Sequence, residues 1–387
     1  MAKGRRFQAT GKGSFFGDYA YSSFLRRHPN HFLVALSKLF DWSAYSERLV
    51  ELYRGKARVG RPPYDPVLIF KMLLISYLYN VSERDTEKLA DENVPVKWFL
   101  GLAYDQQPPD HSTLTAFKRR MLRTGGWETL QSIFDGLLGE ARAQGLEMGT
   151  IQVLDSVHTQ ADVNNAKDRE RQNRGQGPRD PDARVVNKGR RTVVEADGEA
   201  TEKEVRYRGY KTHTAMNAET GVVTSIEPRL GNTADNKAFP TLRAHEQTVG
   251  LPTHIYAGDR AYDDTDIYAR LTREGLASGI TLNDYRTRKK DANKEPWLQL
   301  QASTSYQQGT RARYRVEQVF GWAKAWCGFE RCRYLGLARY RLQALFTFLV
   351  CNLKRLVKRL VGITFRAQAK GRRAETFRPV YSVVPWA

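Results

Sequence analysis

The spacing of apolar positions divides the chain at about residue 149 into a first part with helical periodicity and a second part with strand-like runs. Apolar residues recur every three or four positions in 66–79, directly after the sequence Gly-Arg-Pro-Pro at 60–63, which predicts a helix beginning at Pro66. Ser82 predicts the N-cap of a second, short helix, and Asp110 that of a third. Short helices in series are typical of helix-turn-helix DNA-binding modules and also of plain helical domains, so both interpretations stay open.

Compact strand-like runs follow, separated by turn signals and helical segments. The expected order is a strand at 150–154, a hairpin at 207–228, a weak helix at 236–249, a strand at 254–257, a helix at 264–274, a short strand at 280–282, a polar connection at 283–309 and helices at 311–326 and 339–360. The segment 156–191 has no Phe, Trp or Tyr and is crowded with polar and basic residues, which predicts a mobile loop near a polyanion. The sequence therefore predicts an α/β fold with a mixed sheet flanked by helices, preceded by an all-α part.

The chain is strongly basic. Its 62 Lys and Arg residues against 42 Asp and Glu give a formal net charge of +20, which indicates a polyanionic partner, with nucleic acid the first candidate. The hydrophobic fraction of 41% is that of a folded protein. The three cysteines form no Cys-x-x-Cys pair, no signal peptide is recognisable, and no apolar run approaches the roughly 18 residues of a membrane span. We therefore expect a soluble, cytoplasmic protein with no membrane partner.

Two clusters of cations are candidates for contacts with a nucleic acid backbone. The third predicted helix carries Lys118, Arg119 and Arg120. The run from 352 to 373 contains many Lys and Arg residues and no Asp or Glu, and it includes Lys354 and Arg355. A solvated basic helix face gives the same pattern as a backbone-binding one.

Three acids stand next to apolar segments, where a carboxylate costs free energy unless it has a compensating partner. They are Asp155 after the first strand, Asp259 after the central strand, and Glu317 on a helix with apolar neighbours. Each alone is more often a cap or turn former than a metal ligand. Together, in this order of elements, they indicate an RNase H-like metal nuclease, because carboxylate oxygens suit Mg²⁺ and a pair of such ions promotes phosphodiester cleavage. His158 belongs to no His/Cys cluster, so we expect a structural role for it, whereas the role of His213 in the expected hairpin stays open.

The helix around Glu317 gives a second indication. Lys324 follows seven residues later and Arg313 precedes it by four, so the three side chains share one face. Such cations would hold DNA phosphates beside a metal-bound acid, although an ordinary salt-bridged face has the same spacing. We expect Trp322 and Trp326 to be packing residues rather than base-stacking ones.

Several sequence blocks occur in an order that points to one family. They are GRPPYDPVLIFKMLL, WFLGL and PDHSTL in the first part, then LDSVHTQA, YKTHTAMNAETG, GNTADNKAF, GDRAYD, RVEQVFGWAK and CNLKRL. With these blocks the chain resembles the bacterial insertion-sequence transposases of the DDE class, in particular the group with a Tyr-Arg-Glu-Lys signature. The signature spacing maps onto Arg313, Glu317 and Lys324, whereas Thr310 stands at the Tyr position and Tyr314 lies nearby.

The resemblance implies a division into an N-terminal arm and helical lead-in (1–60), a helical, helix-turn-helix-like DNA-binding domain (61–130), an RNase H-like catalytic domain (149–335), and a C-terminal helix with a basic tail (336–387). It implies a transposase that binds the terminal repeats of its own element, cleaves DNA and joins the freed 3′-OH ends to target DNA. A homodimer on paired double-stranded ends is expected.

The resemblance also assigns roles to the candidate residues. Asp155, Asp259 and Glu317 are expected to bind Mg²⁺, with Mn²⁺ able to substitute. Arg313 and Lys324 are expected to grip phosphates near the cut, and the cations at 118–120 and 354–355 to hold flanking duplex. Two alternatives remain open, an RNase H-like DNA nuclease without strand transfer and a catalytically silent DNA-binding regulator.

Overall fold

Helices fill the first part of the chain, as the apolar spacing predicts. The computed structural model describes residues 7–8, 10–11, 13–53, 62–123, 125–194, 200–287 and 294–365, so the basic N-terminus and the cationic run after residue 365 lie outside the described residues. The helices of this part are α1 (Phe15–Arg27), α2 (Phe32–Leu39), α3 (Ser46–Glu51), α4 (Pro66–Leu78), α5 (Glu83–Glu92), α6 (Val94–Leu100), α7 (His111–Arg123) and α8 (Gly126–Ala143).

The predicted helix starts are confirmed by their caps. Pro66 opens α4, the Ser82 hydroxyl accepts from the Asp85 amide at 3.1 Å, and Asp110 accepts from the Thr113 amide at 2.8 Å. The sequence analysis missed α6, whose first turn contains Pro95, because the helix is only two turns long and shows little periodicity.

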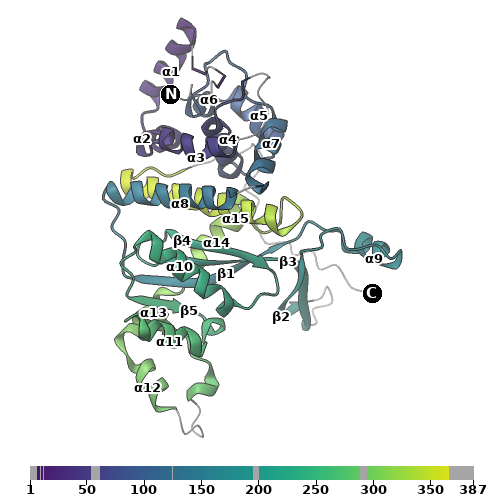
Figure 1. Ribbon diagram of the computed structural model, residues 1–387, viewed down its shortest axis with the longest axis vertical. Coiled ribbons are helices and arrows are strands. Elements are labelled where there is room, and N and C mark those ends of the chain that lie inside the picture. Colours follow the sequence, from purple (N-terminus) through teal and green to yellow (C-terminus); the bar gives the residue numbers. More distant parts are fainter. Residues whose placement is uncertain are drawn as a thin grey trace.

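A mixed sheet forms the second part of the chain (Figure 1). Its strands are β1 (Ile151–Gln160), β2 (Arg184–Val194), β3 (Ala200–Asn217), β4 (Val223–Leu230), β5 (Ile255–Gly258) and β6 (Ala277–Ile280). The order is β2-β3-β1-β5-β6, with β4 also paired to β3. The pairs β1–β3, β2–β3 and β3–β4 are antiparallel, whereas β1–β5 and β5–β6 are parallel. The predicted mixed sheet is therefore confirmed.

Both faces of the sheet bury apolar side chains. Val153 and Met216 belong to the main core, which continues through α14 (Arg315–Cys327) and α15 (Leu337–Val361) into the N-terminal helices. Leu154 and Tyr256 belong to a second core beneath α10 (Phe239–Val249) and α11 (Thr265–Arg273). The alternation of neighbours such as Val153 and Leu154 between the two cores is the period of two that a doubly covered strand requires.

Helix α15 joins the two parts of the molecule. In Figure 1 it runs with α8 between the N-terminal helices and the sheet. The ring of Phe346 stacks on Tyr77 of α4 with centroids 5.4 Å apart, and Asn352 exchanges hydrogen bonds with the backbone of Val223 in β4. The predicted helix at 339–360 is thus present, and it lies in the core.

Two predictions of irregular structure are wrong. The segment 156–191 contains the second half of β1, the helix α9 (Asn165–Asn173) and the start of β2. The segment 283–309 contains α12 (Glu295–Ala302) and most of α13 (Thr304–Ala312), so the helix expected at 311–326 begins only at Arg315. These helices are short and bury few side chains, none in the case of α12, so they leave no apolar periodicity in the sequence. Over the described ranges, no helix has the length and apolar character needed to cross a membrane.

Candidate active site

Asp155 and Asp259 lie side by side at the centre of the sheet. Strands β1 and β5 run parallel with Leu154 opposite Gly258, so the next residue of each strand is one of the two acids. Asp259 follows the end of β5, as predicted. Asp155 does not end a strand, because β1 continues to Gln160 through its pairing with β3. The prediction of a strand end at Asp155 is therefore wrong, whereas its nearness to Asp259 holds.

Backbone amides fix the orientation of both carboxylates. Asp155 accepts a hydrogen bond from the amide of Ser156 at 2.7 Å. Asp259 accepts from the amide of Ala261 at 3.0 Å and so caps a short 3₁₀ turn over Arg260–Tyr262. Each carboxylate is thus held by its own backbone and keeps further acceptor positions.

The electrostatic surroundings of the pair disfavour two negative charges. Burial raises the pKa of Asp155 to about 7, and the nearby carboxylates of Asp259 and Asp235 act in the same direction, against the cation of Arg313. Burial and the charge of Asp235 raise the pKa of Asp259, against Arg313 and Lys211. A bound cation would relieve this repulsion, since it favours the ionised form of both groups.

Asp235 is a third acid beside the pair that the sequence analysis did not single out. It lies in a 3₁₀ turn over Asp235–Ala238 and pairs with Lys211 Nζ at 2.6 Å and His213 Nδ1 at 3.0 Å, both from β3. Although burial opposes ionisation, the hydrogen bonds from His213 and Lys211 lower the pKa of Asp235 to about 2. The available signal was Lys211 and His213 at alternate positions of one strand, which places two polar groups on the same face of the sheet.

The signature residues lie at the start and along the exposed side of α14. Arg313 falls in the break between α13 and α14 and acts electrostatically on Asp155 and Asp259. Glu317 is exposed in the first turn of α14, and Lys324 is partly exposed in its last turn. Among the described residues, no group of three or more His, Cys, Asp or Glu side chains is close enough to hold a metal ion. The role of Glu317 as the third ligand stays a prediction.

The two tryptophans of α14 lie on the exposed side of the helix, and their role as packing rather than base-stacking residues stays a prediction. Trp322 is 37% exposed and Trp326 is 56% exposed, because aliphatic and small side chains on the opposite side of the helix fill the core contact. The guanidinium of Arg355 lies 4.9 Å from the Trp322 ring centroid. Thr310, at the signature Tyr position, donates to the Tyr306 carbonyl within α13, while Tyr314 is exposed.

The predicted backbone-binding cations differ in their exposure. Arg119 and Arg120 are exposed on α7, and the guanidinium of Arg120 lies 4.1 Å from the Tyr53 ring centroid. Lys118 is largely buried, pairs with Glu83 and lies over the Tyr334 ring. In α15 the partly exposed Lys354 lies over Phe365, as Arg355 lies over Trp322. Their contacts with DNA stay predictions.

Two family models match the chain, a transposase domain (DUF772) over residues 22–120 and a transposase DDE domain over residues 173–353. The chain belongs to the DDE transposases of insertion sequences. The second match includes Asp235, Asp259 and Glu317, whereas Asp155 precedes it. The expected RNase H-like fold of this transposase, a mixed sheet with flanking helices after a helical N-terminal part, is confirmed.

Solved transposase structures show a distant likeness. The chain is similar to the piggyBac transposase synaptic complex with hairpin DNA at 10% identity and a TM-score of 0.41, covering 86% of this chain and 76% of that one. It is also similar to the Mos1 transposase paired-end complex with the left transposon end at 9% identity and a TM-score of 0.20, covering 69% and 80%. Neither likeness supports an argument about single residues.

The donors at the carboxylate pair fit a divalent cation, on which DDE transposases depend. Mg²⁺ is commonly held by one or two carboxylates, with waters and substrate phosphates completing an octahedron. Asp155 and Asp259 supply two such oxygen donors from adjacent strands, and burial with like charge raises the pKa of both. The chemistry of this donor set therefore suits a hard cation.

Proposed function

We propose that this transposase binds the ends of its own insertion sequence, cleaves DNA phosphodiesters there and joins the freed 3′-OH ends to target DNA. The observation that carries the proposal is the partly buried pair of Asp155 and Asp259, which the parallel strands β1 and β5 bring side by side. In this proposal the pair holds Mg²⁺, or Mn²⁺ in its place. A cation held by these two carboxylates would supply Lewis-acid activation of a water or 3′-hydroxyl and stabilisation of the departing oxygen.

The other signature residues act around this pair. Arg313 acts electrostatically on Asp155 and Asp259, which supports a role in neutralising a phosphate bound beside them. Glu317 and Lys324 share the solvent side of α14, which leaves the acid accessible to a metal ion and the cation accessible to a phosphate. Glu317 is the third carboxylate of the site in this proposal.

Double-stranded DNA is the proposed partner, at the element ends and at the target. The net charge of +20 supports binding to its phosphates. We assign end binding to the helical region 61–130 and catalysis to 149–335, with the preceding arm and the C-terminal region 336–387 supporting them. Two ends are processed together, which requires two copies of the chain, so the working form is a homodimer on paired ends.

Cleavage of labelled duplex tests this function. The duplex contains the DNA that borders the gene, and cleavage is compared in Mg²⁺ for the wild type, Asp259→Ala and the control Asp266→Ala, which removes an exposed acid of α11. We expect cuts at the element ends that persist in the control and disappear in Asp259→Ala, with end binding retained. A second labelled duplex reports joining of the 3′ ends.

Each outcome assigns the function differently. Cleavage without joining would identify a nuclease, and binding without cleavage by any form would identify a DNA-binding regulator. Equal cleavage by Asp259→Ala and wild type would remove Asp259 from the site.

A further inference from the structure

An arm projects from the catalytic part between β1 and β2. It comprises residues 161–183, contains α9, and extends beyond the sheet in Figure 1. We call it the α9 arm. Nothing in the active-site geometry described above uses it, although it continues directly from the strand that carries Asp155. Gln160 stands five positions after Asp155, so the arm leaves the sheet roughly 17 Å along β1 from the catalytic pair.

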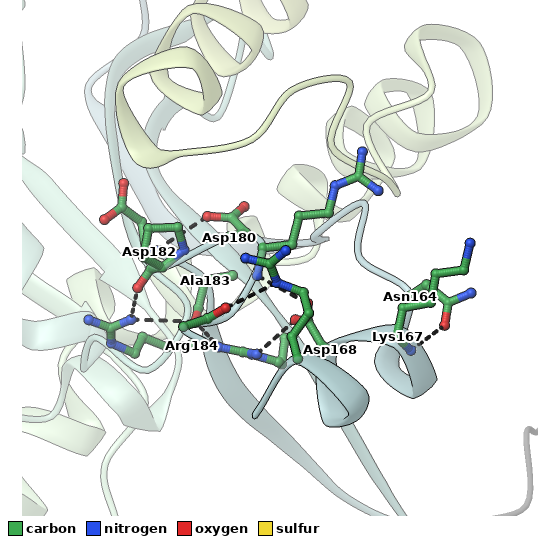
Figure 2. A network of polar contacts seen from close by, with 12 residues as sticks. Asn164, Lys167, Asp168, Asp180, Asp182, Ala183 and Arg184 are labelled. Carbon is green, nitrogen blue, oxygen red and sulfur yellow. Dashed lines mark hydrogen bonds and ion pairs between the residues drawn. The ribbon is translucent and has the colours of Figure 1, made fainter. Parts of the chain in front are cut away.

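Buried carboxylates anchor the α9 arm to the rest of the protein (Figure 2). Asp168, almost fully buried, accepts from the Arg179 amide at 3.0 Å and pairs with Arg208 of β3 at 3.2 Å. Asp180, fully buried, accepts from the Tyr210 hydroxyl at 2.7 Å. These contacts fix both the helix and the returning chain of the arm to β3.

The base of the arm also caps the N-terminus of α15. The Gly336 amide donates to Asp180 at 3.3 Å and the Leu337 amide donates to Asp182 at 2.9 Å. Helix N-termini leave amides without intrahelical partners and favour nearby negative charge. α15 has no side-chain cap from its own N-cap residue, so the arm supplies one. These contacts therefore hold the arm in a defined position against β3 and α15.

The fold separates the charges of the arm. Acids and bases are equally numerous from 162 to 182, so the composition of the segment predicts no net charge. The acids Asp168, Asp180 and Asp182 turn inward to the contacts just described, and in Figure 2 Lys167 points away from them. The cations are all exposed: Lys167, Arg169, Arg171, Arg174 and Arg179. The outer surface of the arm is consequently cationic, with only Asp162 and Glu170 as exposed acids.

The spacing of these cations forms a stripe. Lys167, Arg171 and Arg174 stand at i, i+4 and i+7 along α9 and its C-cap, so they lie on one side of the helix. Arg171 also donates through Nε to the Gly177 carbonyl at 3.2 Å, which holds the turn after the helix. A rigid row of cations on a projecting helix suits the regularly spaced phosphates of a DNA backbone.

We propose that the α9 arm binds the phosphate backbone of duplex DNA flanking the cleavage site, an inference that rests on the proposed function. Lys167, Arg171 and Arg174 contact phosphates, and Asp168, Asp180 and Asp182 hold the arm in place. The contacts add affinity without reading sequence, because cations on phosphates carry no base information.

The salt dependence of binding tests the arm. The double variant Lys167→Ala/Arg174→Ala removes two cations and keeps Arg171, whose backbone contact supports the turn. The matched single variants are Arg174→Ala and Arg273→Ala, each removing an exposed arginine at the end of a nine-residue helix, α9 or α11. Binding of the full-length protein to labelled duplex bordering the gene is measured by fluorescence anisotropy between 50 and 200 mM NaCl.

Losing two phosphate contacts lowers the slope of log affinity against log salt by about 1.8. Over this salt range the wild-type affinity is therefore expected to fall about tenfold more than that of the double variant. Arg174→Ala is expected to give half the change in slope, and Arg273→Ala none. The unfolding curves of the variants, measured in parallel, are expected to match the wild type because neither side chain is buried.

Other results overturn the proposal. If the double variant keeps the wild-type slope of log affinity against log salt, and still binds and cleaves DNA, the arm is not part of the DNA interface and the proposed function stands. If the wild type does not bind DNA, the arm proposal and the proposed function both fail. A changed oligomeric state with unchanged DNA binding assigns the arm to contacts between copies of the chain.

Discussion

Asp155→Asn tests whether the site is electrostatically frustrated without metal. The pKa of the carboxyl rises from 3.8 to about 7 because burial and the charges of Asp259 and Asp235 oppose ionisation. The unfolded chain ionises near pH 4, so between pH 4 and 7 the folded state holds a proton that the unfolded state releases. The free energy of unfolding is therefore unaffected by this carboxyl below pH 4, and it falls as the pH rises from 4 to 7. Each pKa unit corresponds to about 1.4 kcal/mol, so the loss at pH 8 is on the order of 4 kcal/mol.

Asparagine keeps the acceptor for the Ser156 amide and cannot ionise, so it removes this loss. We expect urea unfolding without divalent ions to show nearly equal stability of wild type and Asp155→Asn at pH 4, and a more stable variant at pH 8 by up to about 4 kcal/mol. Asp162→Asn, at an exposed position just after the same strand, is the control. Parallel pH profiles for wild type and Asp155→Asn would refute the argument that Asp155 is buried against like charge.

Two further substitutions probe the surroundings of the pair. Asp235→Asn leaves the largely buried Lys211 ammonium without its carboxylate, and we expect a loss of about 3 kcal/mol in urea unfolding, where a change below about 1 kcal/mol would contradict the ion pair. Lys324→Ala removes a cation from the exposed side of α14, and we expect slower cleavage of the element ends with unchanged Mn²⁺ binding by calorimetry. Unchanged cleavage would make Lys324 an ordinary surface residue.

The sequence predicts most of the fold wherever an element buries a regular set of apolar side chains. The α4 helix and the strand β5 satisfy this condition because nearly all of their side chains are buried, and in β1 the run Gln152–Leu154 before Asp155 is buried. The helices α9 and α12 do not, since α9 buries only Asp168 and α12 buries nothing. Their stability depends on caps and tertiary contacts, which leave no periodicity to detect.

The site was predictable only in part, for a similar reason. Asp155 and Asp259 stand out because each follows a buried apolar run, and adjacent parallel strands then bring them together. Asp235 follows no such run, and its importance comes from Lys211 and His213, which are more than twenty residues earlier in the chain. Pairing across that separation depends on the register of β3 against β1, which no local pattern fixes.

The positions of the acids in the fold determine where this transposase exposes its positive charge. Asp155 and Asp259 meet at the centre of the sheet with Asp235 beside them, and burial together with the charges of the other two acids raises the pKa of Asp155. In the α9 arm the inward carboxylates are used as anchors, which leaves an electrically neutral stretch of sequence with a cationic outer surface. Long-range attraction of a polyanion depends on exposed charge. The net charge of +20 therefore does not show how unevenly the charge is distributed, with acids gathered at the centre of the sheet and cations on the outer surface of the α9 arm.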